Sequence, residues 1–303
     1  MNTDTMATND SDDLVFSNLE FYRNNHGKQL YYKWQGEIWW KPTPDAALEK
    51  LFAIVGMNAT KVFLKEHPEY GEAGHRINRE LALYCHPETG DILYQWRWPG
   101  LLQENGQGNG QGNGQGNGQG DAPPNHPSVP VVPIANRIVQ GTVKPKELTV
   151  PKGQDYKKVV TEIPLDYPHP LADDETYRDY CPGERFQAVE CFTSYVSRPG
   201  FMGAPPAEWS RECPWLPWMG LGYGHPAQLH FKTTIARVET FEELNPNLVE
   251  LVRSRVPIYE HTPDHTDEPN VTSILYFKQH FDTYLKGVGA ASPGENRFPI
   301  EDR

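Results

Sequence analysis

The sequence lacks long apolar runs and any excess of basic residues. No stretch approaches the roughly 20 apolar residues of a membrane-spanning helix, and the N-terminus has no basic segment followed by an apolar one. The 28 Lys and Arg are outnumbered by 40 Asp and Glu, giving a formal charge of −12. This balance argues against nucleic acid or a membrane surface as a partner, because both are anionic. We therefore expect a soluble, cytoplasmic protein.

Metal-binding and cofactor-binding motifs are also missing. The four cysteines lie far apart and form no Cys-x-x-Cys pair, so we expect reduced thiols rather than disulfides or a zinc knuckle. His261 and His265 have the spacing of two metal ligands on a helix, but Pro263 interrupts a helix there, which favours a solvated acidic loop. Glycine-rich nucleotide loops, the Gly-x-Ser-x-Gly elbow and His-Glu-x-x-His are absent. We expect neither a metal nor a cofactor.

The sequence does contain many segments that alternate between apolar and polar residues. In residues 30–40 the even positions are mostly large and apolar, and the odd ones include Lys33, Gln35 and Glu37, as in a half-buried strand. Strands are predicted at 30–40, 51–64, 77–85, 92–98, 129–142, 157–165, 186–196, 207–213 and 228–239. Short helices are predicted at 14–22, 248–255 and 272–285.

Strands that follow one another without helices between them pair in antiparallel fashion, and a sheet of this size closes or curls to protect its edges. The predicted fold is mainly β (α+β): a single antiparallel β-barrel or strongly curved sheet, lipocalin-like in architecture, with short helices at the termini. Residues 1–13 are expected to be a disordered tail, 14–286 a single domain, and 287–303 a flexible tail.

Residues 105–120 are four copies of Asn-Gly-Gln-Gly inside a polar, Pro-rich segment. Such a composition has no apolar side chains to bury, so residues 103–127 are predicted to be a disordered insert in the domain. An expanded surface loop is favoured over a binding tether, because long flexible loops cost little free energy.

Four motifs together resemble the bacterial domain-of-unknown-function family 1838. They are GMNATKV at 56–62, RELALYCHPETGDIL at 79–93, AEWSRECPWLPWMGLG at 207–222 and PNVTSILYFK at 269–278. The Pro- and Trp-rich PWLPWM segment is the most specific of them. After the hairpin predicted from the strands at 77–85 and 92–98, the family tends to continue with an Asn-Pro turn, whereas this chain has the glycine insert. The resemblance brings no known activity with it.

Three charged residues fall on strand faces that are otherwise apolar, where a charge must be paired or functional. They are Arg79, Glu190 and Arg211. We expect these candidate catalytic residues to form a polar cluster inside the barrel that orients the carboxylate or carbonyl of a ligand, because arginine offers a planar pair of donors. A buried ion pair without a ligand is the alternative.

A second set of residues could line a hydrophobic pocket, since barrels of this size often hold one small ligand. The candidates are Asn58, Trp34, Trp96, Trp209, Trp215, Trp218, Met219, His230 and Tyr276. Core packing alone could account for most of the tryptophans. Trp215 and Trp218 lie in a loop flanked by Pro and Gly, which favours a pocket rim or a partner surface. For His230, an outward-facing histidine is favoured over a general base.

Three functions follow from these candidates. The first is a cofactor-independent lyase or isomerase of secondary metabolism that acts on a small hydrophobic or aromatic molecule in the barrel. The second is a non-catalytic carrier of such a ligand, which turnover would distinguish from the first. The third is an interaction protein in which exposed Trp215 and Trp218 form an oligomer interface, such as that of a homodimer.

Overall fold

The computed structural model describes residues 21–68, 71–93, 134–139, 146–148, 156–197 and 207–265, with Ile274, Leu275 and Lys278. The predicted tails, the glycine insert, Trp96 and Tyr276 lie outside these residues.

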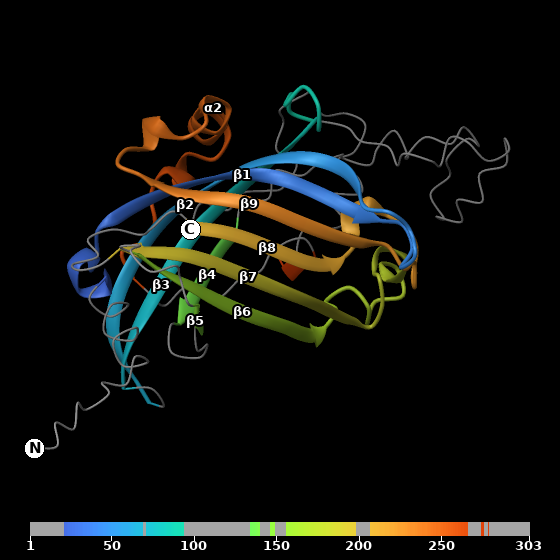
Figure 1. Ribbon diagram of the computed structural model, residues 1–303, viewed down its shortest axis with the longest axis horizontal. Coiled ribbons are helices and arrows are strands. Elements are labelled where there is room, and N and C mark those ends of the chain that lie inside the picture. The colour runs from blue at the N-terminus through green and yellow to red at the C-terminus, as the bar shows by residue number, and fades with distance from the viewer. Residues whose placement is uncertain are drawn as a thin grey trace, which may run out of the picture.

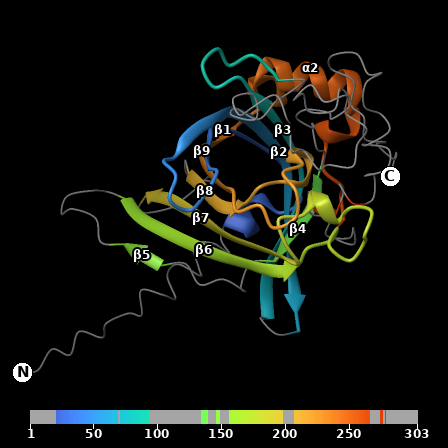
Figure 2. The ribbon, with the colours of Figure 1, turned by 90° about the vertical axis from the view of Figure 1, so that its right-hand side faces the viewer.

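The described residues form one antiparallel sheet of nine strands (Figure 1). The strands are β1 (Gln29–Lys41), β2 (Glu49–His67), β3 (Gly71–Cys85), β4 (Ile134–Val139), β5 (Lys146–Leu148), β6 (Tyr156–Pro168), β7 (Arg185–Ser197), β8 (Ala207–Pro214) and β9 (Gln228–Val238). Their order across the sheet is β4-β3-β2-β1-β9-β8-β7-β6-β5. The sheet curls strongly about an axis along its strands (Figure 2). The predicted mainly β, antiparallel, strongly curved fold is therefore confirmed.

Most strands agree with the prediction in position, and two regions differ. The short strand β5 was not predicted, because three residues are too few to show an alternating pattern. In the predicted strand 92–98, Ile92 makes only an isolated bridge to Cys85, and residues beyond 93 lie outside the described part. The turn before Ile92 contains Gly90 at φ 76°, a conformation that glycine adopts without strain.

The helices are short. The helix α2 (Pro246–Arg255) confirms the prediction at 248–255, and the side chain of Asn245 caps it by accepting a hydrogen bond from the Asn247 N–H. Residues 21–25 are also helical. Ile274, Leu275 and Lys278, the described residues of the predicted helix at 272–285, are helical too. The described part of the chain also has four 3₁₀ turns: η1 (Arg178–Tyr180), η2 (Pro217–Met219), η3 (Phe241–Glu243) and η4 (Pro257–Glu260). Within the described part, none of the helices has the length and apolar character needed to cross a membrane.

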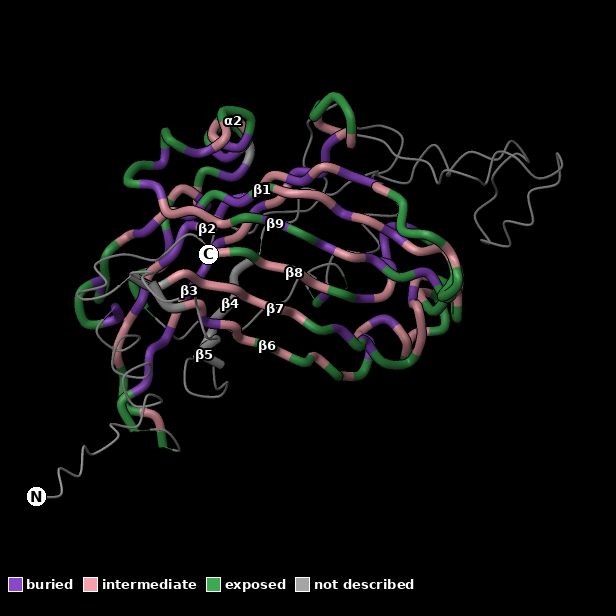
Figure 3. Tube along the Cα trace, in the orientation of Figure 1, coloured by how far each residue is buried: buried purple, intermediate pink, exposed green. Residues whose placement is uncertain are grey.

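Burial alternates along the central strands, and each face of the sheet has its own apolar cluster (Figure 3). On the convex face, α2 and η4 cover β2 and β3, so that Met57 and Leu81 pack against Leu248 and Val252. On the concave face, Ile38, Phe52 and Phe231 pack with the η2 segment. Both faces of the sheet are thus covered at β2 and β3, which determines how the charged residues of β3 are buried.

At one end of the concave face lies a third, smaller cluster. Tyr22, from the helical residues 21–25, packs there with Leu30, Tyr32 and Val62. The ring of Tyr22 lies over Gly74, where an added Cβ would come within 2.7 Å of it. Large apolar side chains therefore occupy both ends of the concave face, and its polar residues lie between them.

Candidate functional site

Polar side chains gather in the middle of the concave face. Glu190 on β7 is paired across the sheet with Arg211 on β8, and Arg211 is paired with the core residue Phe231 on β9. Glu80 on β3 is paired with Asn58 on β2. Directly paired residues of antiparallel strands project from the same face, so the register places both carboxyl groups inside the curve of the sheet.

Glu190 and Arg211 form a half-buried ion pair. Arg211 Nε lies 3.5 Å from Glu190 Oε1, and the two side chains are 17% and 20% exposed. The guanidinium carbon of Arg211 also lies 5.4 Å from the ring centroid of Phe186. The sequence grouped these two charges correctly, and each side chain keeps some contact with solvent.

Glu80 is held by a chain of hydrogen bonds. Trp34 Nε1 donates to Asn58 Oδ1 at 2.7 Å, and Asn58 Nδ2 donates to Glu80 Oε2 at 3.1 Å. The indole N–H can only donate, so it fixes which way the Asn58 amide points. The Trp34 ring covers Gly56, where a Cβ would lie 2.1 Å from ring atoms. Glycine is therefore required at position 56 for Trp34 to occupy this place.

The charge of Glu190 influences the pKa of Glu80. Burial, and then the negative charge of Glu190, raise the pKa of Glu80 to about 7, while the hydrogen bond from Asn58 and the charge of Arg211 partly oppose the rise. A carboxyl group with a pKa near neutrality is suited to both giving and accepting a proton. The arrangement therefore offers one carboxyl group poised for proton transfer beside a second that is paired with arginine.

Aromatic side chains form the wall beside these groups. The rings of Trp34 and Trp209 meet edge to face at 6.1 Å between centroids, and Trp209 lies 5.6 Å from Phe231. Trp209 is only half-buried, yet its Nε1 is shielded from solvent and has no hydrogen-bond partner. This wall is therefore an apolar surface that contains one shielded donor without a partner.

Arg79 lies on the other face, so its predicted grouping with Glu190 and Arg211 is wrong. Its Nη1 donates to the carbonyl oxygens of Ile258 at 2.5 Å and His261 at 2.8 Å, in the segment that covers the convex side. Arg79 does share a face with buried leucines, as predicted. However, β3 packs against apolar residues on both of its faces, so apolar neighbours alone do not show which face is the concave one.

The other predicted ligand-binding residues divide between the two faces and the core. His230 lies on the convex face, with Nδ1 3.5 Å from Glu212 Oε1. Trp215, Trp218 and Met219 are at most 5% exposed and belong to the concave-side core. The interaction hypothesis required exposed tryptophans at 215 and 218, and the structure buries both.

Sequence reasoning missed Glu80. The strand at 77–85 alternates between two faces, and its leucines indicated that the face of Arg79 is the inner one. The opposite face holds Arg76, Asn78, Glu80 and Tyr84, a run of polar and aromatic residues. One feature of the sequence could have identified Glu80. Arg79 and Glu80 are adjacent in a strand and so lie on opposite faces, which means that one of the two charges must lie on the inner face of the curved sheet.

The cysteines are all free thiols, as predicted. Burial raises the pKa of Cys213, which lies beside Arg211, to about 11, so its thiol is protonated at neutral pH. Among the residues that the structure describes, no group of three or more His, Cys, Asp or Glu is placed to hold a metal ion.

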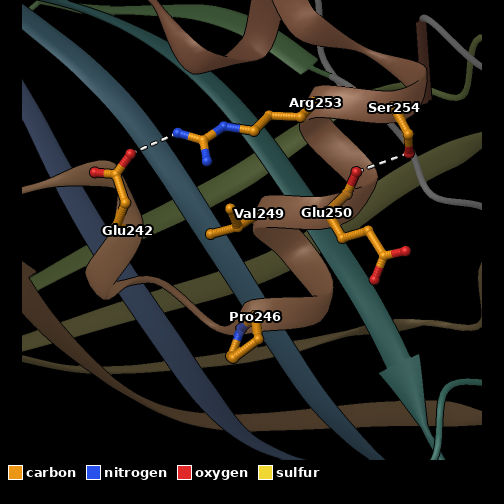
Figure 4. Close-up of a pocket in the computed structure, with 6 residues that line it drawn as sticks. All are labelled: Glu242, Pro246, Val249, Glu250, Arg253 and Ser254. Atoms are coloured by element: carbon orange, nitrogen blue, oxygen red, sulfur yellow. Dashed lines mark hydrogen bonds and ion pairs between the residues drawn. The ribbon is translucent and has the colours of Figure 1, made fainter.

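A separate hollow lies on the convex side, along α2 (Figure 4). It is lined by Glu242, Pro246, Val249, Glu250, Arg253 and Ser254. Arg253 donates to Glu242 at 2.5 Å, and Ser254 donates to the Glu250 carbonyl at 2.7 Å. These groups satisfy one another across an open surface, so this hollow lacks the unpaired buried groups seen on the concave face.

The fold and the concave cluster define a class: antiparallel β proteins whose strongly curved sheet surrounds polar groups between two apolar ends. The model of the family described as "Protein of unknown function (DUF1838)" matches residues 27–105 and 118–281, and the gap between them falls within the Asn-Gly-Gln-Gly repeat. This chain belongs to that family. No curated protein and no solved structure matches it.

Proposed function

We propose that the concave face binds a small molecule with an aromatic or hydrophobic body and that Glu80 and Glu190 transfer protons to and from it. The protein would then be a cofactor-independent isomerase or lyase. The observation that carries this proposal is the pair of half-buried carboxyl groups, one of which has its pKa raised to about 7 beside the other.

The chemistry balances with these two groups alone. The Glu190 carboxylate accepts a proton from a carbon of the substrate, and the Glu80 carboxyl group donates a proton to another atom of the same molecule. In an isomerisation that atom is a carbon or a carbonyl oxygen, and in an elimination it belongs to the leaving group. Exchange with water then restores both carboxyl groups.

The surrounding residues have supporting roles. Arg211 keeps a positive charge beside Glu190 and can donate to a carbonyl oxygen on which negative charge develops. Trp34 and Trp209 contact the apolar body, and Trp34 also orients Asn58 and through it Glu80. Carrying a ligand without reaction would use the same wall but would not require a carboxyl group with a raised pKa.

The test is proton exchange in heavy water. Aryl ketones with acidic α-hydrogens are incubated with the protein, their binding is followed by tryptophan fluorescence, and deuterium uptake is followed by NMR. We expect uptake that Glu80→Gln and Glu190→Gln each reduce at least tenfold, with binding retained, while Glu212→Gln on the convex face has no effect. Binding without exchange would identify a carrier, and absence of both would contradict the proposal.

A further inference from the structure

A second polar group lies on the concave face, nearer to the end closed by Tyr22. Tyr32 on β1 is paired directly with Arg237 on β9 and, on its other side, with Asn58 on β2. Arg76 on β3 is paired with Val62, a core residue of the same face. The register therefore directs Tyr32, Arg76 and Arg237 into the same end of the curved sheet.

These three side chains have buried polar atoms that lack partners. The Nε atoms of Arg76 and Arg237 and the hydroxyl of Tyr32 are shielded from solvent and make no hydrogen bond. Tyr32 as a whole is 8% exposed. In the described part of the chain no carboxylate is within ion-pair distance of either arginine. Buried guanidinium groups are normally paired, because an uncompensated buried charge is costly.

Arg79 and Arg211 differ from these two arginines in having partners that the structure describes. Arg79 donates to two carbonyl oxygens, and Arg211, whose Nε also makes no hydrogen bond, has the Glu190 carboxylate at 3.5 Å. Among the described residues, Arg76 interacts with the hydroxyl groups of Tyr22 and Tyr32 and Arg237 with that of Tyr32, and neither has a carboxylate partner, although acidic residues outnumber basic ones by 40 to 28 in the whole chain. A region of uncompensated positive charge inside an acidic protein is suited to an anionic ligand.

We propose that Arg76 and Arg237, together with the Tyr32 hydroxyl, bind the anionic group of the molecule whose body lies against Trp34 and Trp209. The substrate class is then an aromatic or hydrophobic acid. This inference rests on the proposed function, since it concerns the same ligand. Tyr32 and Trp34 are two residues apart on β1, a separation of about 7 Å along a strand. The acid group is thus next to the ring system, on the side away from Phe231.

The test compares a matched pair of probes, 2-naphthoate and 2-naphthamide, which have nearly the same shape but differ in charge. Binding is measured by isothermal titration calorimetry. We expect naphthoate to bind at least tenfold more tightly than naphthamide to the parent protein. Arg76→Gln and Arg237→Gln should each remove most of this preference by weakening naphthoate alone. Arg185→Gln, at an exposed arginine paired with Asp166, is the matched control and should change neither affinity.

The outcomes separate this inference from the proposed function. Equal affinities for the two probes, unchanged in both variants, would overturn the anion site and leave the aromatic site intact. Binding of neither probe would overturn both. A preference for 2-naphthyl phosphate over 2-naphthoate that depends on the same arginines would support the site and assign it to phosphate esters.

Melting temperatures distinguish a binding role of Arg76 and Arg237 from a structural one. Without ligand, Arg76→Gln and Arg237→Gln should melt at or above the temperature of the parent, because each removes an unpaired buried charge. A clear fall in melting temperature would instead assign the arginines to the fold and overturn the inference. If a variant does not fold, the salt dependence of the parent decides: naphthoate binding should weaken with ionic strength and naphthamide binding should not, and equal behaviour would overturn the inference.

Discussion

The sheet buries arginine on both of its faces, and the two faces satisfy the guanidinium groups differently. On the convex side, Arg79 donates to the carbonyl oxygens of Ile258 and His261 and lies 5.8 Å from the ring centroid of Tyr259. On the concave side, Arg211 has one carboxylate at 3.5 Å, and the Nε atoms of Arg76 and Arg237 have no partner.

This difference distinguishes an arginine whose donors the chain satisfies from arginines whose donors it leaves unused. Arg79 holds the segment after α2 against β3. Both acceptors of its hydrogen bonds are backbone carbonyl oxygens of the protein, so no ligand is needed to satisfy it. The concave arginines leave donors unused in a part of the molecule that also contains Glu80, whose pKa is raised to about 7. Unsatisfied and perturbed groups collect at binding sites because a ligand completes them.

The largest effect on stability is expected on the convex face, at Arg79. Arg79→Met removes two charge-assisted hydrogen bonds and leaves the His261 carbonyl oxygen without this donor, which should lower the free energy of unfolding by about 4 kcal/mol. Urea unfolding measures the loss. Arg185→Met, at an exposed ion pair, should cost less than about 1 kcal/mol. Similar losses of stability in the two variants would contradict the prediction that Arg79 contributes more to stability than an exposed arginine.

The next largest effect is pH-dependent and belongs to Glu80. Its pKa in the folded protein, about 7, is above the ordinary value of 4.5, so ionising Glu80 destabilises the parent as the pH rises through this range. Glu80→Gln removes that cost. The variant should be more stable than the parent by roughly 3 kcal/mol above pH 7, and the advantage should vanish below about pH 4.5.

Urea unfolding at several pH values measures the difference in the free energy of unfolding between Glu80→Gln and the parent. Glu212→Gln, which changes an exposed carboxylate on the convex side, is the control and should give a pH-independent difference. A Glu80→Gln advantage that does not change with pH would show that Glu80 ionises as an ordinary surface group.

A smaller effect is expected at Glu190. Glu190→Gln breaks an ion pair whose members are about one fifth exposed, so the expected loss of stability is about 1 to 2 kcal/mol, well below that of a fully buried pair. The same change removes a charge that raises the pKa of Glu80. The pKa of Glu80 should therefore be lower in Glu190→Gln, so the fall in stability with rising pH should end at a lower pH than in the parent. An unchanged pH profile would contradict the effect of Glu190 on Glu80.

The smallest effect is expected at Trp34. Trp34→Phe removes the indole N–H that orients Asn58, at a cost of about 1 kcal/mol. Trp39→Phe, on the opposite face of the same strand, loses a hydrogen bond to Glu37 and should cost only a few tenths. Calorimetric melting compares the two. In the proton-exchange assay, Trp34→Phe should slow deuterium uptake and Trp39→Phe should not.

The sequence predicted much of this arrangement correctly. Two-residue alternation located most strands, and it placed Glu190 and Arg211 on one face of neighbouring strands. It also selected Asn58 and Trp34, which the structure joins by a hydrogen bond. It did not find Glu80, whose significance comes from Glu190, about 110 residues further along the chain, and a strand pattern carries no information about which distant strands become neighbours.

What the sequence determined by itself is the class of fold, because alternating apolar residues separated by turns can bury their apolar sides only by pairing and curling. What the tertiary structure alone decided is which face became the inside. Alternation assigns residues to two faces but is symmetric between them, and α2 covers the convex one. Arg79 and Glu80, adjacent in the chain, therefore came to have opposite surroundings: one tied to backbone carbonyls and the other placed beside a second carboxyl group.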